Sequence, residues 1–304
     1  MHTIGITGGT GLVGSELAQL LQEAGHRVII FSTREGLRNE NQQVRYGYWN
    51  PYKQYIDLEL LGETTAMVHL AGAGIADKRW TAARKQEIAT SRIDVTRFLV
   101  TQMSQYALQC RTFVSASAIG YYGPDRGNLP FRESDPPYND FLGSTCRDWE
   151  EAANSRSERF RTVILRSGIV LSGKGGAFPK FVQPANRGLY PLLGGGRQVI
   201  SWIGVRDMAR MIAFALDHEA IQGIYNAVAP YPATQAALMR AIGKCKHGPK
   251  IYVPVPSLAL KLMLGEMSIE VLKSTTVSAA KISDAGFRFE QEHIEPAVQE
   301  ILHK

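Results

Sequence analysis

Three glycines near the start of the chain have the spacing of a loop that binds phosphate. Gly8, Gly11 and Gly14 recur every third residue within TGGTGLVG, directly after an apolar segment. In such a loop one glycine turns the chain, one lets the backbone approach a pyrophosphate, and one lets helix and strand pack closely, while the first N–H groups of the helix face the phosphates. The motif therefore predicts a dinucleotide site. Its predicted contacts are Gly8, Thr10, Gly11, Leu12, Val13 and Gly14.

The residues after the second apolar segment indicate which dinucleotide binds. A site for NAD places a carboxylate there to hold the ribose 2′-hydroxyl, whereas a site for NADP needs a cation. This chain has Ser32, Thr33 and Arg34, and its first acid is Glu35. The planar fork of Arg34 suits a 2′-phosphate, with Ser32, Thr33 or Arg38 as further contacts. The sequence therefore predicts NADP(H) as the cofactor.

A parallel sheet must position these residues. Short β-branched runs that are continuously apolar read as strands buried on both faces. They comprise residues 3–7, 28–32, 67–71, 112–115 and 162–165. Helical patterns separate them at residues 12–24 and 81–106. Strand, helix and strand repeated in this order predict an α/β, doubly wound parallel sheet with right-handed crossovers.

The last third of the chain has a different pattern. Prolines and the run Gly194–Gly196 break regular structure, and helical patterns then appear at residues 208–216, 236–242 and 258–264. We expect a nucleotide-binding domain over residues 1–170, to which 197–222 return. A smaller substrate-binding lobe is expected over 171–196 and 223–304.

Composition limits the classes of partner. The 304 residues carry 34 Lys+Arg against 28 Asp+Glu, a formal charge of +6. Because the basic residues are scattered, they favour an anionic small molecule over nucleic acid. Three widely spaced cysteines predict neither a disulfide framework nor a metal site. The start has no signal-peptide pattern and no run is long enough to span a membrane, so a cytoplasmic protein is expected, as monomer or homodimer.

Several motifs in order resemble the short-chain dehydrogenase/reductases, in particular their extended, epimerase-like branch and its atypical NADP(H)-binding "epimerase family proteins". The motifs are TGGTGLVG at the start, VHLAG at 68–72, RWTAARKQEI at 79–88, SASAIGYYG at 115–123, CRDWE at 146–150, LRSGIVL at 165–171, GGGRQVISWIGVRD at 194–207 and LGEM at 264–267. The resemblance covers nearly the whole chain and implies a Rossmann-type fold. It also implies that Leu70, Ala71, Gly72 and Ser115 contact the cofactor.

The resemblance implies a catalytic role for Ser117, at the end of the fifth strand, in binding a substrate oxygen. The tyrosine and lysine of the family's YxxxK pair would fall at Leu142 and Cys146, and neither residue can do that work. Cys146 is expected to be a small buried residue rather than a nucleophile.

Tyr121 and Tyr122 are the remaining acid–base candidates. Arg166, Arg197 or Lys180 could supply a nearby cation, and Arg166, Arg197 and Trp202 are the predicted substrate contacts. Two functions stay open. One is an NADP(H)-dependent oxidoreductase or epimerase-like enzyme acting on a carbonyl compound or nucleotide sugar. The other is a non-catalytic NADP(H)-binding redox sensor or scaffold.

Overall fold

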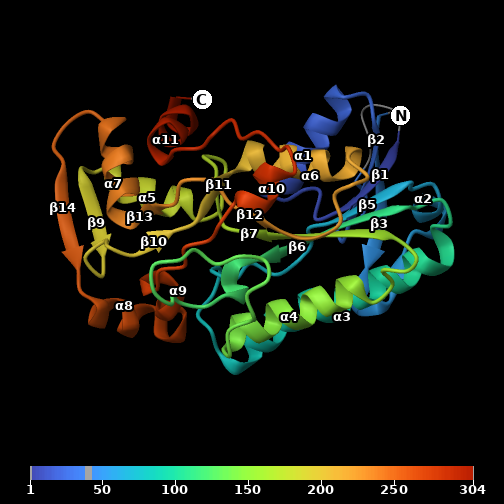
Figure 1. Ribbon diagram of the computed structural model, residues 1–304, viewed down its shortest axis with the longest axis horizontal. Coiled ribbons are helices and arrows are strands. Elements are labelled where there is room, and N and C mark those ends of the chain that lie inside the picture. Colours follow the sequence, from blue (N-terminus) through green and yellow to red (C-terminus); the bar gives the residue numbers. More distant parts are fainter. Residues whose placement is uncertain (1, 38–42, 304) are drawn as a thin grey trace.

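An eight-stranded sheet forms the centre of the computed structural model, which describes residues 2–37 and 43–303 (Figure 1). The strand order is β12-β7-β6-β5-β1-β2-β3-β4, and all neighbours are parallel except β3 and β4. The strands are β1 (Thr3–Thr7), β2 (Arg27–Ser32), β3 (Val44–Asn50), β4 (Tyr55–Ile56), β5 (Ala66–His69), β6 (Thr112–Ala118), β7 (Arg161–Ser167) and β12 (Gly223–Ala227). The predicted doubly wound α/β sheet is confirmed.

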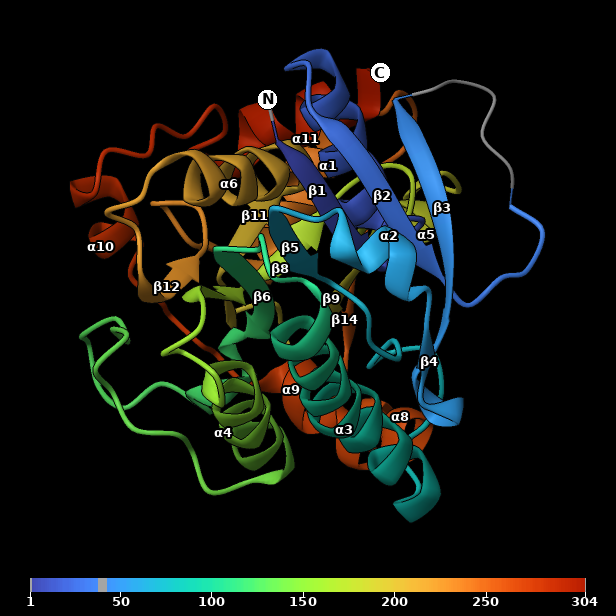
Figure 2. The same ribbon diagram turned by 90° about the vertical axis from the view of Figure 1, so that its right-hand side faces the viewer.

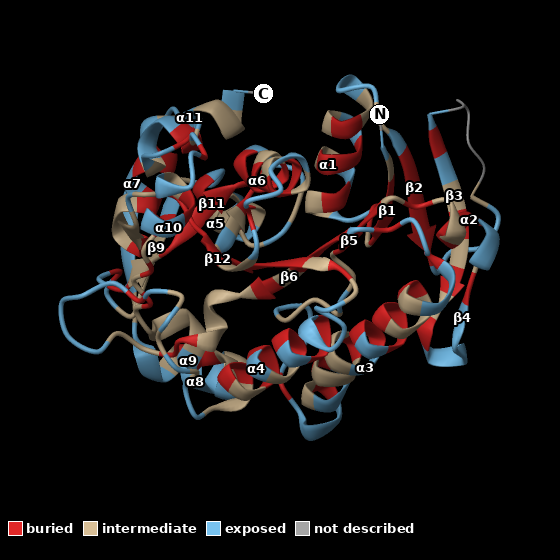
Figure 3. Ribbon diagram, turned by 45° about the vertical axis from the view of Figure 1, so that its right-hand side comes forward, coloured by how far each residue is buried: buried red, intermediate tan, exposed pale blue. Residues whose placement is uncertain are grey.

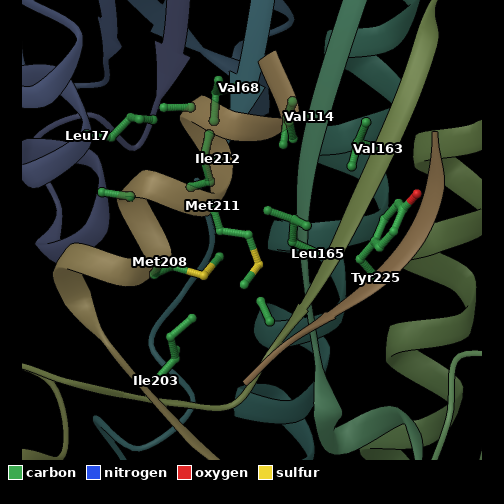
Figure 4. Packing of buried hydrophobic residues seen from close by; sticks show 14 of the residues in the cluster. Leu17, Val68, Val114, Val163, Leu165, Ile203, Met208, Met211, Ile212 and Tyr225 are labelled. Carbon is green, nitrogen blue, oxygen red and sulfur yellow. The ribbon is translucent and has the colours of Figure 1, made fainter. Parts of the chain in front are cut away.

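Helices cover both faces of this sheet (Figures 1 and 3). One face carries α1 (Leu12–Glu23) and α6 (Val205–Asp217), and the other carries α2 (Leu58–Gly62), α3 (Ala82–Tyr106) and α4 (Phe141–Asn154). Figure 4 shows Met208, Met211 and Ile212 of α6 packed toward Val114 and Leu165 of the sheet. Both faces are apolar, which explains why these strands read as continuous apolar runs.

The observed strands differ from the predicted ones by one to three residues at several ends; β7, for example, continues to Ser167, two residues beyond its predicted end. β3 is absent from the prediction, because Arg45, Gly47 and the mixed polar residues around them break the apolar run. β5 ends at His69, two residues before its predicted end. β6 continues to Ala118, three residues beyond its predicted end. The last difference matters for the site because side chains alternate between the faces of a strand.

The last third builds a lobe beside the sheet. Its strand pairs are β8 (Ile169–Leu171) with β11 (Trp202–Gly204), β9 (Leu189–Leu193) with β14 (Ile251–Val255), and β10 (Val199–Ile200) with β13 (Ala233–Thr234). Its helices are α5 (Phe178–Ala185), α7 (Gln235–Lys244), α8 (Ser257–Leu264), α9 (Ser268–Leu272), α10 (Ala280–Asp284) and α11 (Ile294–His303). β12 pairs with β7 in the main sheet, so the sheet reaches residue 227, beyond the boundary predicted at 223.

In the described part of the chain, three 3-10 turns link these elements: η1 (Pro51–Lys53), η2 (Ile119–Tyr121) and η3 (Gly265–Met267). No helix within residues 2–37 and 43–303 is long and apolar enough to span a bilayer.

Candidate functional site

The glycine-rich loop between β1 and α1 has the tight geometry of a phosphate cradle. Gly8 has φ +71°, and a Cβ there would lie 2.8 Å from the Leu70 carbonyl carbon. A Cβ on Gly14 would meet the Gly8 carbonyl and lie 2.6 Å from the Gly9 Cα. Gly11 caps α1 without a side-chain hydrogen bond, and the first turn of the helix holds no acid. The first N–H groups of α1 and its positive dipole end are therefore suited to bind an anion.

A cavity of about 440 Å³ opens beside this loop. Eight predicted cofactor contacts line it: Gly8, Thr10, Gly11, Ser32, Thr33, Leu70, Ala71 and Gly72. They come from the carboxyl ends of β1, β2 and β5, where a doubly wound sheet binds its ligand. The structure thus brings together residues that are up to 64 positions apart in the sequence, from Gly8 to Gly72.

The other wall residues are not predicted by the sequence motifs. They are Phe31, Trp49, Pro51, Tyr52, Ala73, Glu87, Ser91 and Val95, from the end of β2, β3, η1, the loop after β5 and α3. On the β3 side the wall includes the buried Trp49 and the exposed Tyr52, and the exposed tyrosine ring is suited to a flat base. The signal in the sequence is the cluster YGYWNPY at residues 46–52, which is aromatic and ends in a proline turn.

Five predicted cofactor contacts do not line the cavity as the structure stands. Gly14 is buried in the helix–loop contact, and Ser115 is fully buried in β6. Leu12 packs near Gly175 and Gly176 of the lobe, and Val13 packs against the main core. Arg34 is exposed next to the wall, and its backbone N–H donates to the Ser32 hydroxyl over 3.2 Å. Arg38 lies outside the described residues.

The loop from β5 to α3 borders the cavity and is held by side chains. The Ser91 hydroxyl accepts from the N–H of Ala73, 3.0 Å away. Four successive carbonyls of this loop then accept from side chains: Ala73 from Arg92, Gly74 from Arg84, Ile75 from Trp80, and Ala76 from Lys180 of α5. The edge of the cavity is therefore fixed although this segment is neither helix nor strand.

Ser117 belongs to a buried ion-pair network behind β6. Its hydroxyl donates to Glu150 Oε1 over 2.6 Å, and its exposed fraction is 1%. Arg166, also 1% exposed, holds both oxygens of Glu150 through Nε at 2.8 Å and Nη2 at 2.7 Å. Because β6 alternates, Ala116 and Ala118 lie on the opposite face from Ser117. The structure thus directs Ser117 and Arg166 toward Glu150 of α4, and neither residue lines the cavity.

Tyr122 extends the same network. Its hydroxyl donates to Asn226 Oδ1 over 2.6 Å and accepts from Arg166 Nη1 over 2.8 Å. Burial raises the pKa of Tyr122 above its usual range, although Arg166 opposes the shift. Tyr121 is partly exposed, and its ring centre lies 3.4 Å from the Arg166 guanidinium carbon. Of the three predicted catalytic hydroxyls, those of Ser117 and Tyr122 are already engaged inside the protein.

The two α4 positions that correspond to the YxxxK pair are occupied by an apolar cluster and a buried thiol. Leu142 packs with Trp80 and Ile88, and Met267 of the lobe joins them. Burial raises the pKa of the Cys146 thiol to about 12, and Glu150 adds to the shift. Neither residue can exchange a proton at neutral pH.

His69 ends β5 beneath the cavity and is fully buried. Its ring nitrogens bond the hydroxyls of Thr7 at 2.6 Å and Thr96 at 3.0 Å. Burial lowers the pKa of His69 to about 3, so the ring is neutral at pH 7.

The two remaining predicted substrate contacts lie in the lobe. Trp202 has no exposed surface, and its indole N–H donates to the Tyr231 carbonyl over 3.1 Å. It packs in the core of the lobe, so a substrate could reach it only if that core opened. Arg197 is exposed directly after the three glycines Gly194–Gly196, all of which have positive φ.

Comparison with known proteins identifies the family that shares this architecture. The model of the "NAD dependent epimerase/dehydratase family" matches residues 4–227, and that of a "domain of unknown function (DUF1731)" matches residues 255–301. The chain belongs to the NAD dependent epimerase/dehydratase family. The expected resemblance to the epimerase-like branch is therefore confirmed.

Relatives of this epimerase-like family match over almost the full chain. "Epimerase family protein YfhF" of Bacillus subtilis is 34% identical over 300 residues, which cover 98% of this chain and 97% of the relative. The chloroplastic "Epimerase family protein SDR39U1 homolog" of Arabidopsis thaliana is 31% identical, covering 99% and 86%. A crystal structure of the human "epimerase family protein SDR39U1" with NADPH is 27% identical, with a TM-score of 0.88 and 99% of both chains covered. The Rossmann-like fold and a site of the NAD(P)-binding type follow from this membership.

Proposed function

We propose that this epimerase-like protein is an NADP(H)-dependent oxidoreductase that acts on a small molecule, a carbonyl compound or a nucleotide sugar. The observation that carries the cofactor assignment is the end of β2, where Ser32, Thr33 and the exposed Arg34 adjoin the cavity without a carboxylate between them. The related human structure with NADPH supports the same choice. When bound, NADPH supplies a hydride, and the chain's own residues hold and orient it.

The residues present fit such a dinucleotide. The glycine loop leaves a cradle that a Cβ would fill, and the opening N–H groups of α1 provide donors for the diphosphate. The exposed ring of Tyr52 on the β3 side suits the adenine ring. Arg34 would pair with the 2′-phosphate by charge-assisted hydrogen bonds.

Nucleotide titration by calorimetry tests the assignment. Arg34→Ala should weaken NADP(H) binding by roughly 10- to 100-fold, because a hydrogen bond to a charged group contributes about 1.5–3 kcal/mol. NAD(H) binding should stay the same, since NAD has no 2′-phosphate. Arg45→Ala, which removes an exposed arginine paired with Glu63, is the matched control. Equal loss of both nucleotides in Arg34→Ala would refute the assignment.

Tyr121 is our candidate for the proton donor. Its ring is partly exposed on η2 and lies against the Arg166 guanidinium. Ser117 acts in this scheme by orienting Glu150, and Tyr122 by holding Arg166 beneath the Tyr121 ring. Oxidation of NADPH by aldehydes, ketones and nucleotide sugars, followed at 340 nm, should fall in Tyr121→Phe while NADPH binding stays unchanged.

A non-catalytic NADP(H) sensor is the second candidate. Leu142 and the neutral thiol of Cys146 favour it, because neither can move a proton beside the cofactor. The substrate panel separates the two functions. Turnover that Tyr121→Phe abolishes supports the enzyme, whereas tight NADPH binding with no turnover on any class of acceptor supports the sensor.

A further inference from the structure

Arg92 of α3 is a largely buried cation at the edge of the cofactor cavity. A Cβ on Gly72, which lines the cavity, would lie 3.5 Å from the Arg92 guanidinium carbon. Arg92 Nη1 donates to the carbonyls of Ala73 at 3.0 Å and Ile88 at 3.2 Å, so the group is held in one place. The guanidinium also lies over the ring of Trp149 of α4, 5.3 Å from its centre.

Carboxylates on the helices around Arg92 pair with other arginines in the described part of the chain. Glu87, the wall carboxylate on the same helix, pairs with Arg84 at 2.7 Å, and Glu150 of α4 pairs with Arg166. Among residues 2–37 and 43–303, Arg92 has no ion-pair partner. Burial lowers the pKa of Arg92, yet an arginine stays charged at neutral pH. An unpaired buried cation is costly unless an anion or another ligand completes its surroundings.

The sheet order indicates which half of a dinucleotide Arg92 faces. The diphosphate belongs at the start of α1, above β1, and the residues of β2, β3 and η1 form the adenosine side. The other half must then extend over β5 and β6. Arg92 lies on that side, between α3 and α4 just beyond β5, and Figure 2 shows these two helices side by side below the sheet.

We propose that Arg92 supplies the fixed positive charge at the nicotinamide end of this site, and that it makes the site bind the reduced dinucleotide more tightly than the oxidised one. The inference rests on the proposed NADP(H) function and adds a preference for one redox state. The nicotinamide ring is positively charged in NADP⁺ and neutral in NADPH, so a nearby cation repels the oxidised form alone. Cys146 beside it adds no compensating charge, because its thiol is neutral.

The test compares the dissociation constants of NADP⁺ and NADPH by calorimetry. Wild-type protein should bind NADPH more tightly. Arg92→Met should reduce the ratio of the two constants by at least about fivefold, or roughly 1 kcal/mol. Arg92→Lys keeps the charge and should keep most of the ratio. Arg97→Leu, at an exposed arginine of the same helix, is the control and should leave it unchanged.

A double variant moves the charge to the opposite helix. Cys146→Lys combined with Arg92→Met should restore the ratio, because the cation then enters the same space from α4. Equal weakening of both nucleotides in Arg92→Met would overturn the proposal, since Arg92 would then act on the diphosphate or through the loop that it holds, and both redox forms share these contacts. Equal affinities for both redox forms in the wild type would overturn it without any variant. Failure of the wild type to bind either form would instead refute the proposed function.

Discussion

Replacing Glu150 by glutamine tests whether the network behind β6 depends on an ion pair. Glu150 accepts three hydrogen bonds, two from Arg166 and one from Ser117, at 2.6–2.8 Å. The variant keeps the volume and removes the negative charge. Arg166, which is 1% exposed, then remains as a buried cation whose other partners are the Tyr122 hydroxyl and the Glu133 carbonyl.

Breaking a buried pair from one side costs about 3–5 kcal/mol, and we expect about 3 kcal/mol because the amide can still accept one bond. With an unfolding entropy of roughly 0.6 kcal/mol/K for 304 residues, the melting temperature should fall by about 5 °C. Urea denaturation should show the same loss with an unchanged slope. NADPH binding should change little in the folded variant, since the network does not line the cavity.

The matched control is Glu63→Gln. Glu63 also holds Arg45 through two hydrogen bonds, at 2.6 and 2.9 Å, but the two side chains are 39% and 44% exposed. Water screens this pair, so the variant should lose less than about 1 kcal/mol. If Glu150→Gln and Glu63→Gln shift the melting temperature equally, burial does not strengthen the Arg166 pair and the reasoning fails.

Three further outcomes are expected. Gly14→Ala should lower both stability and nucleotide affinity, because the added methyl meets the Gly8 carbonyl; unchanged NADPH titration would contradict the close approach. The buried, neutral His69 should make the free energy of unfolding fall as pH drops from about 6.5 toward 3, by up to about 1.4 kcal/mol per unit, because only the unfolded chain binds that proton. His69→Gln should flatten this slope in urea titrations from pH 7.5 to 4.5. Ellman's reagent should modify Cys245 in the folded chain and leave Cys146 unreacted until denaturant is added. Rapid reaction of Cys146 in the folded chain would show instead that its thiol is accessible and reactive.

Local sequence signals predict eight of the residues that line the cavity, but not the rest of its wall. Glycine spacing and apolar runs are local signals, and they locate the loop from Gly8 and the carboxyl ends of β1, β2 and β5 that line the cavity. The fold follows from the same signals because a buried parallel strand has a composition that can be read directly.

The other end of the site depends on contacts that local patterns do not contain. The direction of Ser117 depends on where β6 ends, and its partner Glu150 is 33 residues away. From the sequence alone, Arg166 would be expected at the surface, as most arginines are. It is buried where it pairs with Glu150. In the sequence Arg92 is one of many scattered basic residues, and its position beside the cavity depends on how α3 packs against Gly72.

The loop after β5 restricts how the length of the chain can vary. Four consecutive carbonyls, from Ala73 to Ala76, accept from side chains on α3, on α5 and within the loop itself. Inserting or deleting one residue there would shift every carbonyl past its donor at once. We therefore expect this segment to keep its length among relatives that bind the same nucleotide, whereas the loops at the outer rim of the lobe can vary.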